Sequence, residues 1–389
     1  MRLEDICKVF TDGDWIESKD QSDEGIRLVQ TGNIGEGKFL EKGDRAKYIS
    51  EETFDSLKCT EIFPGDILVS RLPEPVGRAC IIPEKEERMI TAVDCTICRP
   101  DENMVLKEYL CYFMQSEAYY IRLMNNVTGT TRKRISRKNL GNVELDIPDK
   151  ETQAVVVKNL DILSRIIDGR KEELDKLDEL IKARFVELFG SISYNKFGYE
   201  VMTLQDVCEP IKDGTHQTPT YTEDTVNGYK FLSSKDVTSG KVDWNHLKYI
   251  PEELHKELYK RISPRKGDIL LAKNGTTGVA AIVDRDDIFD IYVSLALLRP
   301  LGMVTSEYLC SAVNSIETKH QFDSSLKGIG VPNLHLGEIK KTKIVVPPIE
   351  AQEKFADFVK QVDKSKVAVQ KALDETKILF DSLMQEYFG

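Results

Sequence analysis

A dense cluster of basic side chains is the first feature of this sequence that could do chemistry. The stretch RKRISRK, from Arg132 to Lys138, holds five positive residues in seven. Lysine and arginine in such a run can contact the phosphates of a nucleic acid, which positions a protein on DNA without reading its sequence. A charge run can equally be a solvated face without a ligand, so both interpretations stay open at this point.

Further candidates for nucleic-acid contact lie in loops that recur in the two halves of the chain. One pair of loops follows the motif GDIL, which begins at Gly65 and again at Gly267. A second pair contains TGN, from Thr31, and SSKD, from Ser233. Forked donors and amides can read base edges, whereas polar turns with glycine are often turns only. The candidate contact residues are Asn33, Arg71, Arg78, Thr131, Arg132, Lys133, Arg134, Arg137, Lys138, Lys235, Lys273, Asn274, Thr276, Thr277, Lys327, Asn333 and His335.

The sequence contains no motif for catalysis or for a bound cofactor. A G-x-x-x-x-G-K-[ST] phosphate loop, a glycine-rich dinucleotide fingerprint and an acidic–Pro–Pro–aromatic tetrad are all missing. CTIC, from Cys95 to Cys98, has metal-ligand spacing, but neither a second cysteine pair nor a suitable histidine follows it. The flanking VDCTICRP alternates as a strand does, so we interpret these cysteines as buried thiols. We therefore predict no catalytic residue and no metal site in this chain.

The elements that must position the candidate residues belong to a tandem repeat. LEDIC at Leu3 returns as LQDVC at Leu204, and KYI, GDIL, RP and EYLC each recur in the same order, at offsets of 199 to 202 residues. This period is far too long for a solenoid, so each copy is expected to be a domain with an attached element. GDILVS, ACIIP, GDILLA and AAIVD predict strands, and 106–124 and 306–322 predict helices. Each copy is therefore expected to be a mixed α/β domain.

A heptad pattern follows the proline that closes each copy. Its two stripes share one register at an offset of 199 residues. The apolar seam residues are Leu160, Leu163, Ile167, Leu174, Leu177, Ile181 and Leu188 in the first stripe, and Val359, Val362, Val369, Leu373, Phe380 and Leu383 in the second. The two helices could each pack on their own domain, or pair with each other as a spacer about 54 Å long. Two matching stripes in one chain have a high mutual effective concentration, which favours pairing.

The composition is that of an ordinary globular chain. Of 389 residues, 41% are hydrophobic and 31% charged, and the net charge of −11 argues mildly against indiscriminate coating of nucleic acid. No apolar run approaches the roughly 20 residues that span a bilayer, and no signal peptide is indicated. We expect the eight cysteines to be reduced thiols in a cytoplasmic protein.

Two α/β domains in direct repeat, each followed by a long heptad helix, resemble the specificity subunit of Type I restriction–modification systems. The GDIL strand entries and the junctions PDKETQ, at Pro148, and PPIEAQ, at Pro347, carry the resemblance, although the first junction has Asp149 where the second has Pro348. The implied fold is mixed α+β: two target recognition domains, 1–148 and 191–347, separated by long helices, 149–190 and 348–389, that form an antiparallel coiled coil.

The resemblance also implies a function and a set of partners. Each domain would read one half of a split sequence in double-stranded DNA. The helices would dock two modification (methyltransferase) subunits, and a restriction/translocase subunit would complete the assembly. S-adenosylmethionine, ATP and Mg²⁺ would act in those partner subunits, with no cofactor in this chain.

Two other functions stay open from the sequence. One is a nuclease or methyltransferase with an unrecognised site, which methyl transfer by the purified chain would reveal. The other is a coiled-coil interaction protein whose DNA-reading domains are vestigial, which DNA binding by the chain would exclude.

Overall fold

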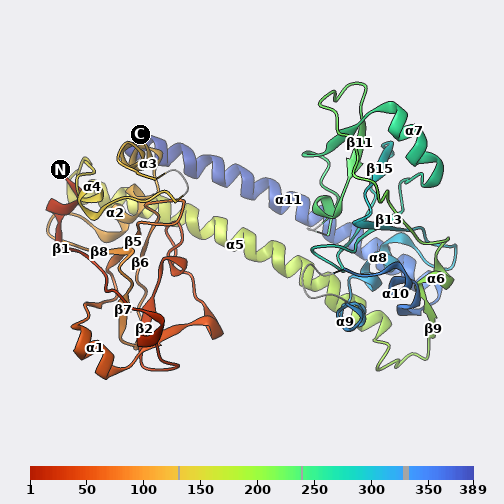
Figure 1. The fold of residues 1–389 in the computed structure, drawn as a ribbon, viewed down its shortest axis with the longest axis horizontal. Coiled ribbons are helices and arrows are strands. Elements are labelled where there is room, and N and C mark those ends of the chain that lie inside the picture. Colours follow the sequence, from red (N-terminus) through yellow and green to blue (C-terminus); the bar gives the residue numbers. More distant parts are fainter. Residues whose placement is uncertain (130–131, 238–239, 327–332) are drawn as a thin grey trace. The chain divides into compact units, whose positions relative to one another are not determined.

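A computed structural model (Figure 1) describes residues 1–129, 132–237, 240–326 and 333–389. The candidate residues Thr131 and Lys327 lie outside these described residues. Two compact units divide the chain: unit 1 comprises Met1–Lys171 with Lys371–Gly389, and unit 2 comprises Glu172–Gln370. Each unit therefore contains one α/β copy together with part of both long helices.

The α/β part of unit 1 is built on an antiparallel sheet with the strand order β1-β8-β5-β6. These strands are β1 (Cys7–Asp12), β8 (Cys95–Pro100), β5 (Ile67–Ser70) and β6 (Ala79–Ile81). β5, the first GDIL strand, lies inside the sheet because Ile67 pairs with both Cys98 and Ile81. The strand predicted for VDCTICRP is confirmed as β8, with Cys95 and Cys98 buried.

A second, smaller sheet in unit 1 has the strand order β3-β2-β7-β4. Its strands are β3 (Lys47–Ile49), β2 (Ile26–Val29), β7 (Met89–Thr91) and β4 (Glu61–Ile62). β2 and β7 are parallel, whereas the other neighbours are antiparallel. Helix α1 (Glu51–Leu57) follows β3 and is capped by the Ser50 hydroxyl, which accepts from the Thr53 amide.

Unit 2 repeats the first sheet and three of the four strands of the smaller sheet, which confirms the tandem repeat in the topology. Its antiparallel sheet has the order β10-β16-β13-β14, and its smaller sheet has the order β12-β11-β15, with β11 and β15 parallel. The strands are β10 (Lys212–Asp213), β16 (Leu295–Leu298), β13 (Ile269–Ala272), β14 (Ala280–Ile282), β12 (Lys248–Ile250), β11 (Tyr229–Leu232) and β15 (Phe289–Ile291). A further antiparallel pair joins β17 (Lys343–Val346) to β9 (Glu200–Thr203).

The two segments predicted as single helices are each divided by a serine. The first forms α2 (Lys107–Phe113) and α3 (Glu117–Met124), and the second forms α8 (Ser306–Val313) and α9 (Ile316–Ser325). Ser116 and Ser315 have extended backbones, and their hydroxyls accept from the Tyr119 and Thr318 amides. Each serine is therefore an N-cap that starts a new helix in a pattern that looked continuous. Further helices are α4 (Arg137–Gly141), α6 (Leu204–Val207), α7 (Glu252–Arg261) and α10 (Leu336–Lys341).

The residues repeated between the copies form the same buried ion pair twice. Asp66 and Asp268 are almost fully buried, and each accepts two hydrogen bonds of 2.7–2.8 Å from the arginine of the RP motif, Arg99 or Arg299. The preceding glycine has a positive φ in both copies, 90° at Gly65 and 88° at Gly267, which favours glycine there. The GDIL and RP motifs thus maintain the frame of each copy.

The long helices are α5 (Lys150–Phe189) and α11 (Ile349–Phe388). A fully buried glutamine attaches each of them to its own copy. Gln352 accepts from the Thr305 amide at 2.9 Å and donates to the Met303 and Pro347 carbonyls. Gln153 makes the matching bonds in unit 1. The glutamine of the proline–acid–Gln junction is therefore a structural clasp.

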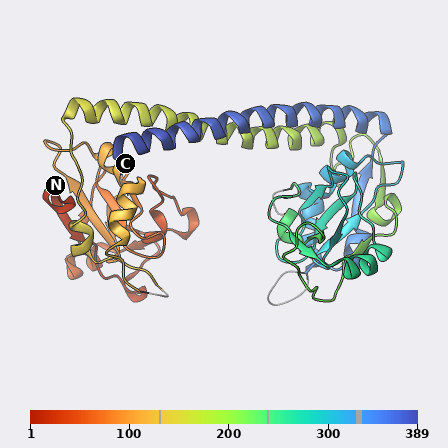
Figure 2. The same cartoon turned by 90° about the horizontal axis from the view of Figure 1, so that it is seen from above.

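The two long helices run antiparallel within each unit, as predicted (Figure 2). In unit 1, Asn159 donates to the Tyr387 hydroxyl at 2.9 Å, and Leu160 shares a core with Met384 and Phe388. In unit 2, positions that rise along α5 meet positions that fall along α11: Asp178 pairs with Lys366, Arg184 lies over Phe358, and Phe185 packs on Phe355. Every predicted seam residue is buried or half-buried. Residues of both helices pack into the hydrophobic core of the α/β copy in their unit. The helices are therefore part of the fold of each unit.

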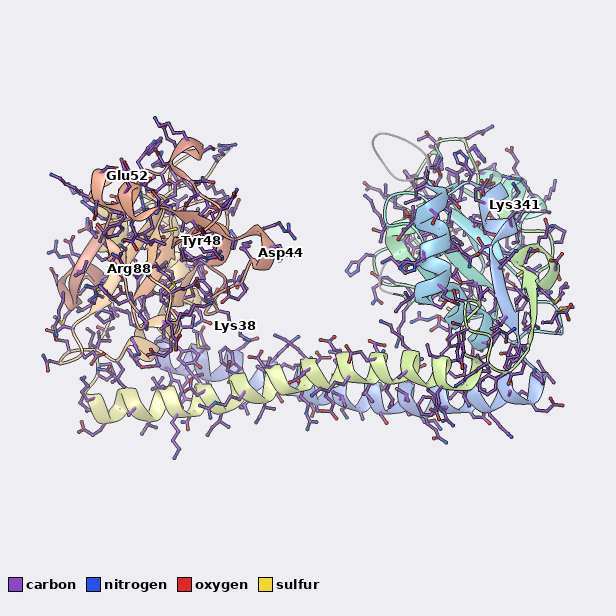
Figure 3. All side chains as sticks on the ribbon, turned by 90° about the horizontal axis from the view of Figure 1, so that it is seen from below. Lys38, Asp44, Tyr48, Glu52, Arg88 and Lys341 are labelled. Carbon is purple, nitrogen blue, oxygen red and sulfur yellow. The ribbon has the colours of Figure 1, made fainter. Side chains whose placement is uncertain are left out.

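An additional ion pair connects a loop of each copy to its own long helix. Lys38, labelled in Figure 3, pairs with Asp168 of α5 in unit 1, and Lys241 lies 3.7 Å from Asp363 of α11 in unit 2. These pairs are largely exposed, so each contributes little to stability. In the described parts of the chain, none of the helices combines the length and the apolar character that a membrane span requires.

Candidate nucleic-acid interface

Three loops of the first copy meet at one end of the β1-β8-β5-β6 sheet. The Arg71 carbonyl, directly after β5, accepts from the Ile135 amide at 3.3 Å. Lys133 forms a 2.7 Å ion pair with Glu74. Arg78 donates to the Thr31 carbonyl at 3.0 Å. The structure thus brings the RKRISRK segment, the loop after GDIL and the TGN turn together.

Arg78 holds these loops together through their backbone. Its Nε donates to the Ile34 carbonyl at 2.6 Å, and its Nη1 lies 3.1 and 3.2 Å from the Pro73 and Pro75 carbonyls. With the bond to Thr31, the forked guanidinium reaches four carbonyl oxygens. Arg78 therefore has a structural role in shaping the loop surface.

Arg71 is the buried centre of the same region, with 6% of its surface exposed. Its Nη2 donates to the Val93 carbonyl at 2.5 Å, and its Nε lies 3.3 Å from Oδ1 of Asp12. Asp12 also accepts from the Thr96 hydroxyl at 3.0 Å and lies 3.7 Å from Arg137. Asp12 thus connects Arg71, Thr96 and Arg137, and it was not among the residues predicted from the sequence.

The RKRISRK segment presents a cluster of exposed cations on unit 1. Arg132, Arg134, Arg137 and Lys138 are exposed, whereas Lys133 is half-buried against Glu74. Ser136 caps α4 by accepting from the Asn139 amide at 3.1 Å, which fixes the end of the segment. The cations of this segment are therefore presented to solvent beside a firmly bonded loop.

The second copy builds the same junction with different side chains. Lys273, the counterpart of Arg71, is 6% exposed and lies 3.2 Å from Asp213, the counterpart of Asp12. Arg261 also lies 3.3 Å from Asp213. The Lys273 carbonyl accepts from the Leu334 amide at 2.8 Å, which matches the bond between Arg71 and Ile135. A buried cation paired with an aspartate therefore organises the loops of both copies.

The surface beside the second junction is polar with little charge. Asn274 and Asn333 form a backbone bridge, and one amide oxygen of each is buried without a partner in the described structure. Both residues are half-buried, as is Thr277, whereas Thr276, Lys235 and His335 are exposed. The structure thus joins the loop after the second GDIL to the segment that corresponds to RKRISRK.

Three predicted contact residues besides Arg78 have internal roles. Asn33 is 2% exposed, its Oδ1 accepts from the Gln30 amide, and its Nδ2 donates to the Leu40 carbonyl. Arg71 and Lys273 are buried against aspartates, as described above. This burial speaks against direct contact of these three side chains with a ligand, because a buried polar group that leaves its partners loses their hydrogen bonds. For the exposed candidates, contact with DNA stays a prediction.

A repeated Asp-Gly pair could have revealed the missed aspartates. Asp12-Gly13 and Asp213-Gly214 recur at the common offset of 201 residues. Neither pair stood out because each is short and resembles an ordinary turn. Only the structure shows that a distant lysine or arginine meets each aspartate.

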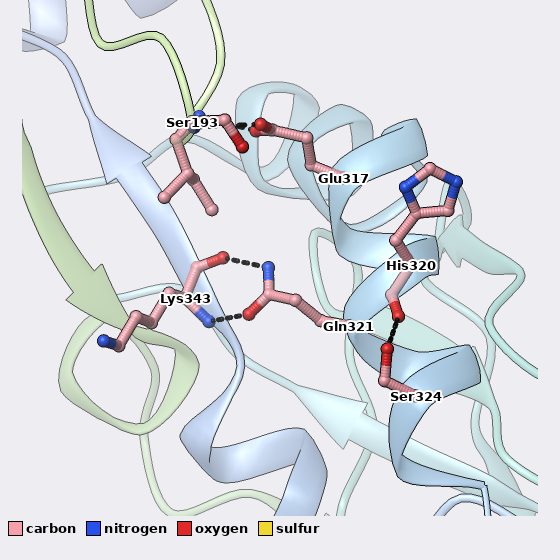
Figure 4. Close-up of a pocket in the computed structure, with 7 residues that line it drawn as sticks. Ser193, Glu317, His320, Gln321, Ser324 and Lys343 are labelled. Atoms are coloured by element: carbon pink, nitrogen blue, oxygen red, sulfur yellow. Dashed lines mark hydrogen bonds between the residues drawn. The ribbon is translucent and has the colours of Figure 1, made fainter.

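A small polar cavity of about 270 Å³ lies elsewhere in unit 2 (Figure 4). It is lined by Ile192, Ser193, Glu317, His320, Gln321, Ser324 and Lys343. Glu317 accepts from the Ile192 and Ser193 amides at 2.5 and 3.0 Å, and the Gln321 amide bonds both backbone groups of Lys343. The side chains of Glu317 and Gln321 are thus hydrogen-bonded to backbone groups. They connect α9 to the segment after α5 and to β17, so we interpret the cavity as structural.

The cysteines have the surroundings of core residues. Cys95 and Cys98 of the CTIC motif are buried, and burial raises the pKa of Cys95 to about 12. The pKa of Cys98 is also raised, chiefly by burial. In the part of the chain that the structure describes, no group of three histidine, cysteine or acidic side chains could hold a metal ion.

A match to a protein-family model identifies the family of this chain. The model described as Type I restriction modification DNA specificity domain matches residues 1–179 and again residues 197–376. The chain belongs to this family. The two matches cover the two sequence repeats, so each copy is one such domain.

Individual relatives support the same assignment. The EcoBI specificity subunit of a type I restriction enzyme from Escherichia coli is 24% identical over 307 residues, or 71% of this chain and 64% of the relative. The MjaVIII specificity subunit from Methanocaldococcus jannaschii is 23% identical, over 66% of this chain and 63% of the relative. The aligned part thus spans somewhat less than two thirds of either relative.

The fold is shared with a solved chain of a type I R-M system. That chain is 17% identical and superposes with a TM-score of 0.58, covering 100% of this chain and 96% of the other. The likeness confirms the predicted mixed α/β fold with two repeated domains and long helices.

Proposed function

We propose that this chain is the sequence-reading subunit of a type I restriction–modification assembly, with one DNA half-site for each α/β copy. One observation carries the proposal: both copies bring the same loops together through the same bonds, but present different side chains. The amide of Ile135 or Leu334 donates to the carbonyl of Arg71 or Lys273, and an aspartate pairs with the buried cation of that residue. A fixed frame with variable surface suits two domains that bind one polymer and read different bases.

The two surfaces suggest an unequal division of work. The first copy presents Arg132, Arg134 and Lys138, which would neutralise phosphates and raise affinity for any sequence. The second presents Thr276 and His335, whose hydroxyl and ring nitrogens suit hydrogen bonds to base edges. We therefore expect the first half-site to contribute more of the salt-dependent affinity.

Catalysis would lie in partner subunits that dock on the long helices. Several apolar residues of these helices point away from the seam: Val155, Ile162 and Ile166 of α5 are 57%, 47% and 42% exposed, and Val367 and Ile378 of α11 are 67% and 69% exposed. Exposed apolar side chains that recur along a helix face indicate a protein interaction surface. We assign these faces to modification subunits, which would bring S-adenosylmethionine. A restriction subunit would bring ATP and Mg²⁺.

Mapping methylated sites tests the recognition proposal. The chain would be co-expressed with a type I modification subunit in a host without DNA methylation, and modified sites would be located by sequencing. We expect a split motif. Exchanging residues 273–278 and 333–335 for those of a relative should change one half of the motif and leave the other half and the spacer length unchanged. Changes in both halves, or no modified motif, would contradict the assignment of one half-site to each copy.

Co-purification tests the docking proposal. Replacing Ile162 and Ile166 with serine should reduce recovery of the modification subunit without lowering the melting temperature of the chain, because both side chains are exposed. The matched control replaces Lys158 and Arg165, exposed polar residues of the same turns, and should retain the partner. Equal recovery with both variants would remove this helix face from the interface.

A further inference from the structure

In each copy, an exposed tryptophan or histidine side chain lies at the end of the sheet where the loops meet. Trp15 is 70% exposed, although tryptophan is usually largely buried. Its counterpart at an offset of 201 residues is His216, whose side chain is 68% exposed. The sequence has two tryptophans, and the other, Trp244, is 8% exposed. The chain thus keeps a large apolar ring in solvent at a position that the repeat defines.

A tight backbone crossing fixes this position in both copies. Gly13 donates to the Cys95 carbonyl at 2.9 Å, and Gly214 donates to the Leu295 carbonyl at 3.3 Å. A Cβ atom at Gly13 would lie 2.3 Å from the Thr91 oxygen, and one at Gly214 would lie 2.0 Å from the Ile291 oxygen. Only glycine allows so close a crossing, so both copies use the same Asp-Gly turn to aim the ring.

The residue before Trp15 or His216 makes hydrogen bonds through both its backbone amide and its backbone carbonyl. Asp14 donates to the Thr91 carbonyl at 2.9 Å and accepts from the Val93 amide at 2.8 Å. Thr215 likewise donates to Ile291 at 3.1 Å and accepts from Val293 at 3.0 Å. Asp14 also accepts from the Thr60 amide at 2.7 Å, and burial raises the pKa of this carboxyl. The backbone that carries each ring is therefore held firmly.

Each crossing is also connected to the proposed DNA-contacting loops. In unit 1, Val93 bonds Asp14 through its amide and Arg71 through its carbonyl. In unit 2, His216 lies 3.3 Å from Asp213, the carboxylate that pairs with Lys273. The rings and the loops thus emerge at the same end of the same sheet.

We infer that Trp15 and His216 are specificity-determining residues that contact the DNA bases of their respective half-sites. The inference rests on the proposed function and extends it to side chains outside the basic and polar loops. Trp15 would pack its ring on bases or wedge into a base step, as apolar side chains do in DNA complexes. Its indole donates to Glu17 at 3.3 Å, which orients the ring without covering it. His216 would place a smaller ring, with hydrogen-bonding nitrogens, at the matching point of the second half-site.

Affinity and salt dependence test this role. The full chain would be titrated with a duplex selected by that chain from a randomised pool. Trp15→Ala should lower affinity by about 5-fold or more, the size of a lost aromatic–base contact. The slope of log K against log salt should not change, because a ring neutralises no phosphate. Trp15→Phe should retain most of the affinity, and the control Tyr194→Ala, which removes a ring that is 72% exposed after α5, should have no effect.

Tryptophan fluorescence supplies a second readout. Because Trp244 is buried, the duplex should change the emission of Trp15 and protect it from iodide, and Trp15→Phe should abolish this response. If the parent chain binds the duplex, but its emission is unchanged and Trp15→Ala binds equally well, this inference is wrong while the proposed function stands. If the parent chain binds no duplex, both are wrong.

Discussion

The basic segment of unit 1 offers the sharpest quantitative test of DNA binding. Arg132 and Arg134 are exposed, and no carboxylate partner is seen for them among the described residues. Lys133, by contrast, already pairs with Glu74 at 2.7 Å, so part of its charge is compensated within the chain. We therefore choose the double variant Arg132→Ala/Arg134→Ala as the perturbation.

The expected magnitude comes from counterion release. Each phosphate contact contributes about 0.9 to the slope of log K against log salt, so losing two should reduce the slope by about 1.8. Between 50 and 200 mM salt, this difference changes the loss of affinity by about 12-fold. The assay is a salt titration of duplex binding by fluorescence anisotropy, with the full chain and one selected duplex.

A control with the same net charge separates local contact from overall charge. Lys158→Ala/Arg165→Ala removes two exposed cations from α5 and should leave the slope unchanged. If both double variants lower the slope equally, the effect is one of net charge. If the arginine variant keeps the parent slope, the RKRISRK segment is a solvated face and our assignment of phosphate contacts to it is refuted.

Three predictions concern stability and can be checked by urea unfolding. His255 and Asp290 are both buried, and their side chains lie 2.7 Å apart. His255→Phe should lower the free energy of unfolding by about 3–5 kcal/mol because it leaves Asp290 buried without its partner, whereas His255→Phe/Asp290→Ile should restore most of that loss. Equal stability of the two variants would contradict this. Gln352→Leu should cost about 3 kcal/mol or more, because it leaves buried backbone groups unpaired; a loss below 1 kcal/mol would mean that water replaces the clasp. Burial opposes ionisation of Glu317, but the amides of residues 192 and 193 outweigh it and hold the pKa of this carboxyl below 4.5. The ionised Glu317 should therefore stabilise the fold above pH 4.5, and this contribution should be lost in more acidic solution. Glu317→Gln should remove this pH dependence.

Much of the architecture could be predicted from the sequence because it is written in local patterns. The tandem repeat, the GDIL strands and the seam through Leu160 and Leu373 depend on periodicity and on residue order. The structure confirms the mixed α/β fold and the antiparallel helices in each unit. The division at Ser116 was not predicted, because a capping serine inside a continuous apolar pattern is a weak signal.

The candidate site could be predicted only in part, because burial depends on distant partners. Arg71 and Lys273 were correctly placed in loops, but their side chains turn inward to Asp12 and Asp213, which are far away in sequence. The sequence by itself determined which segments recur, since order and register survive in the linear chain. Only the tertiary structure decided which side chains remain exposed, because a cation points to solvent or pairs with a carboxylate according to what the fold places beside it.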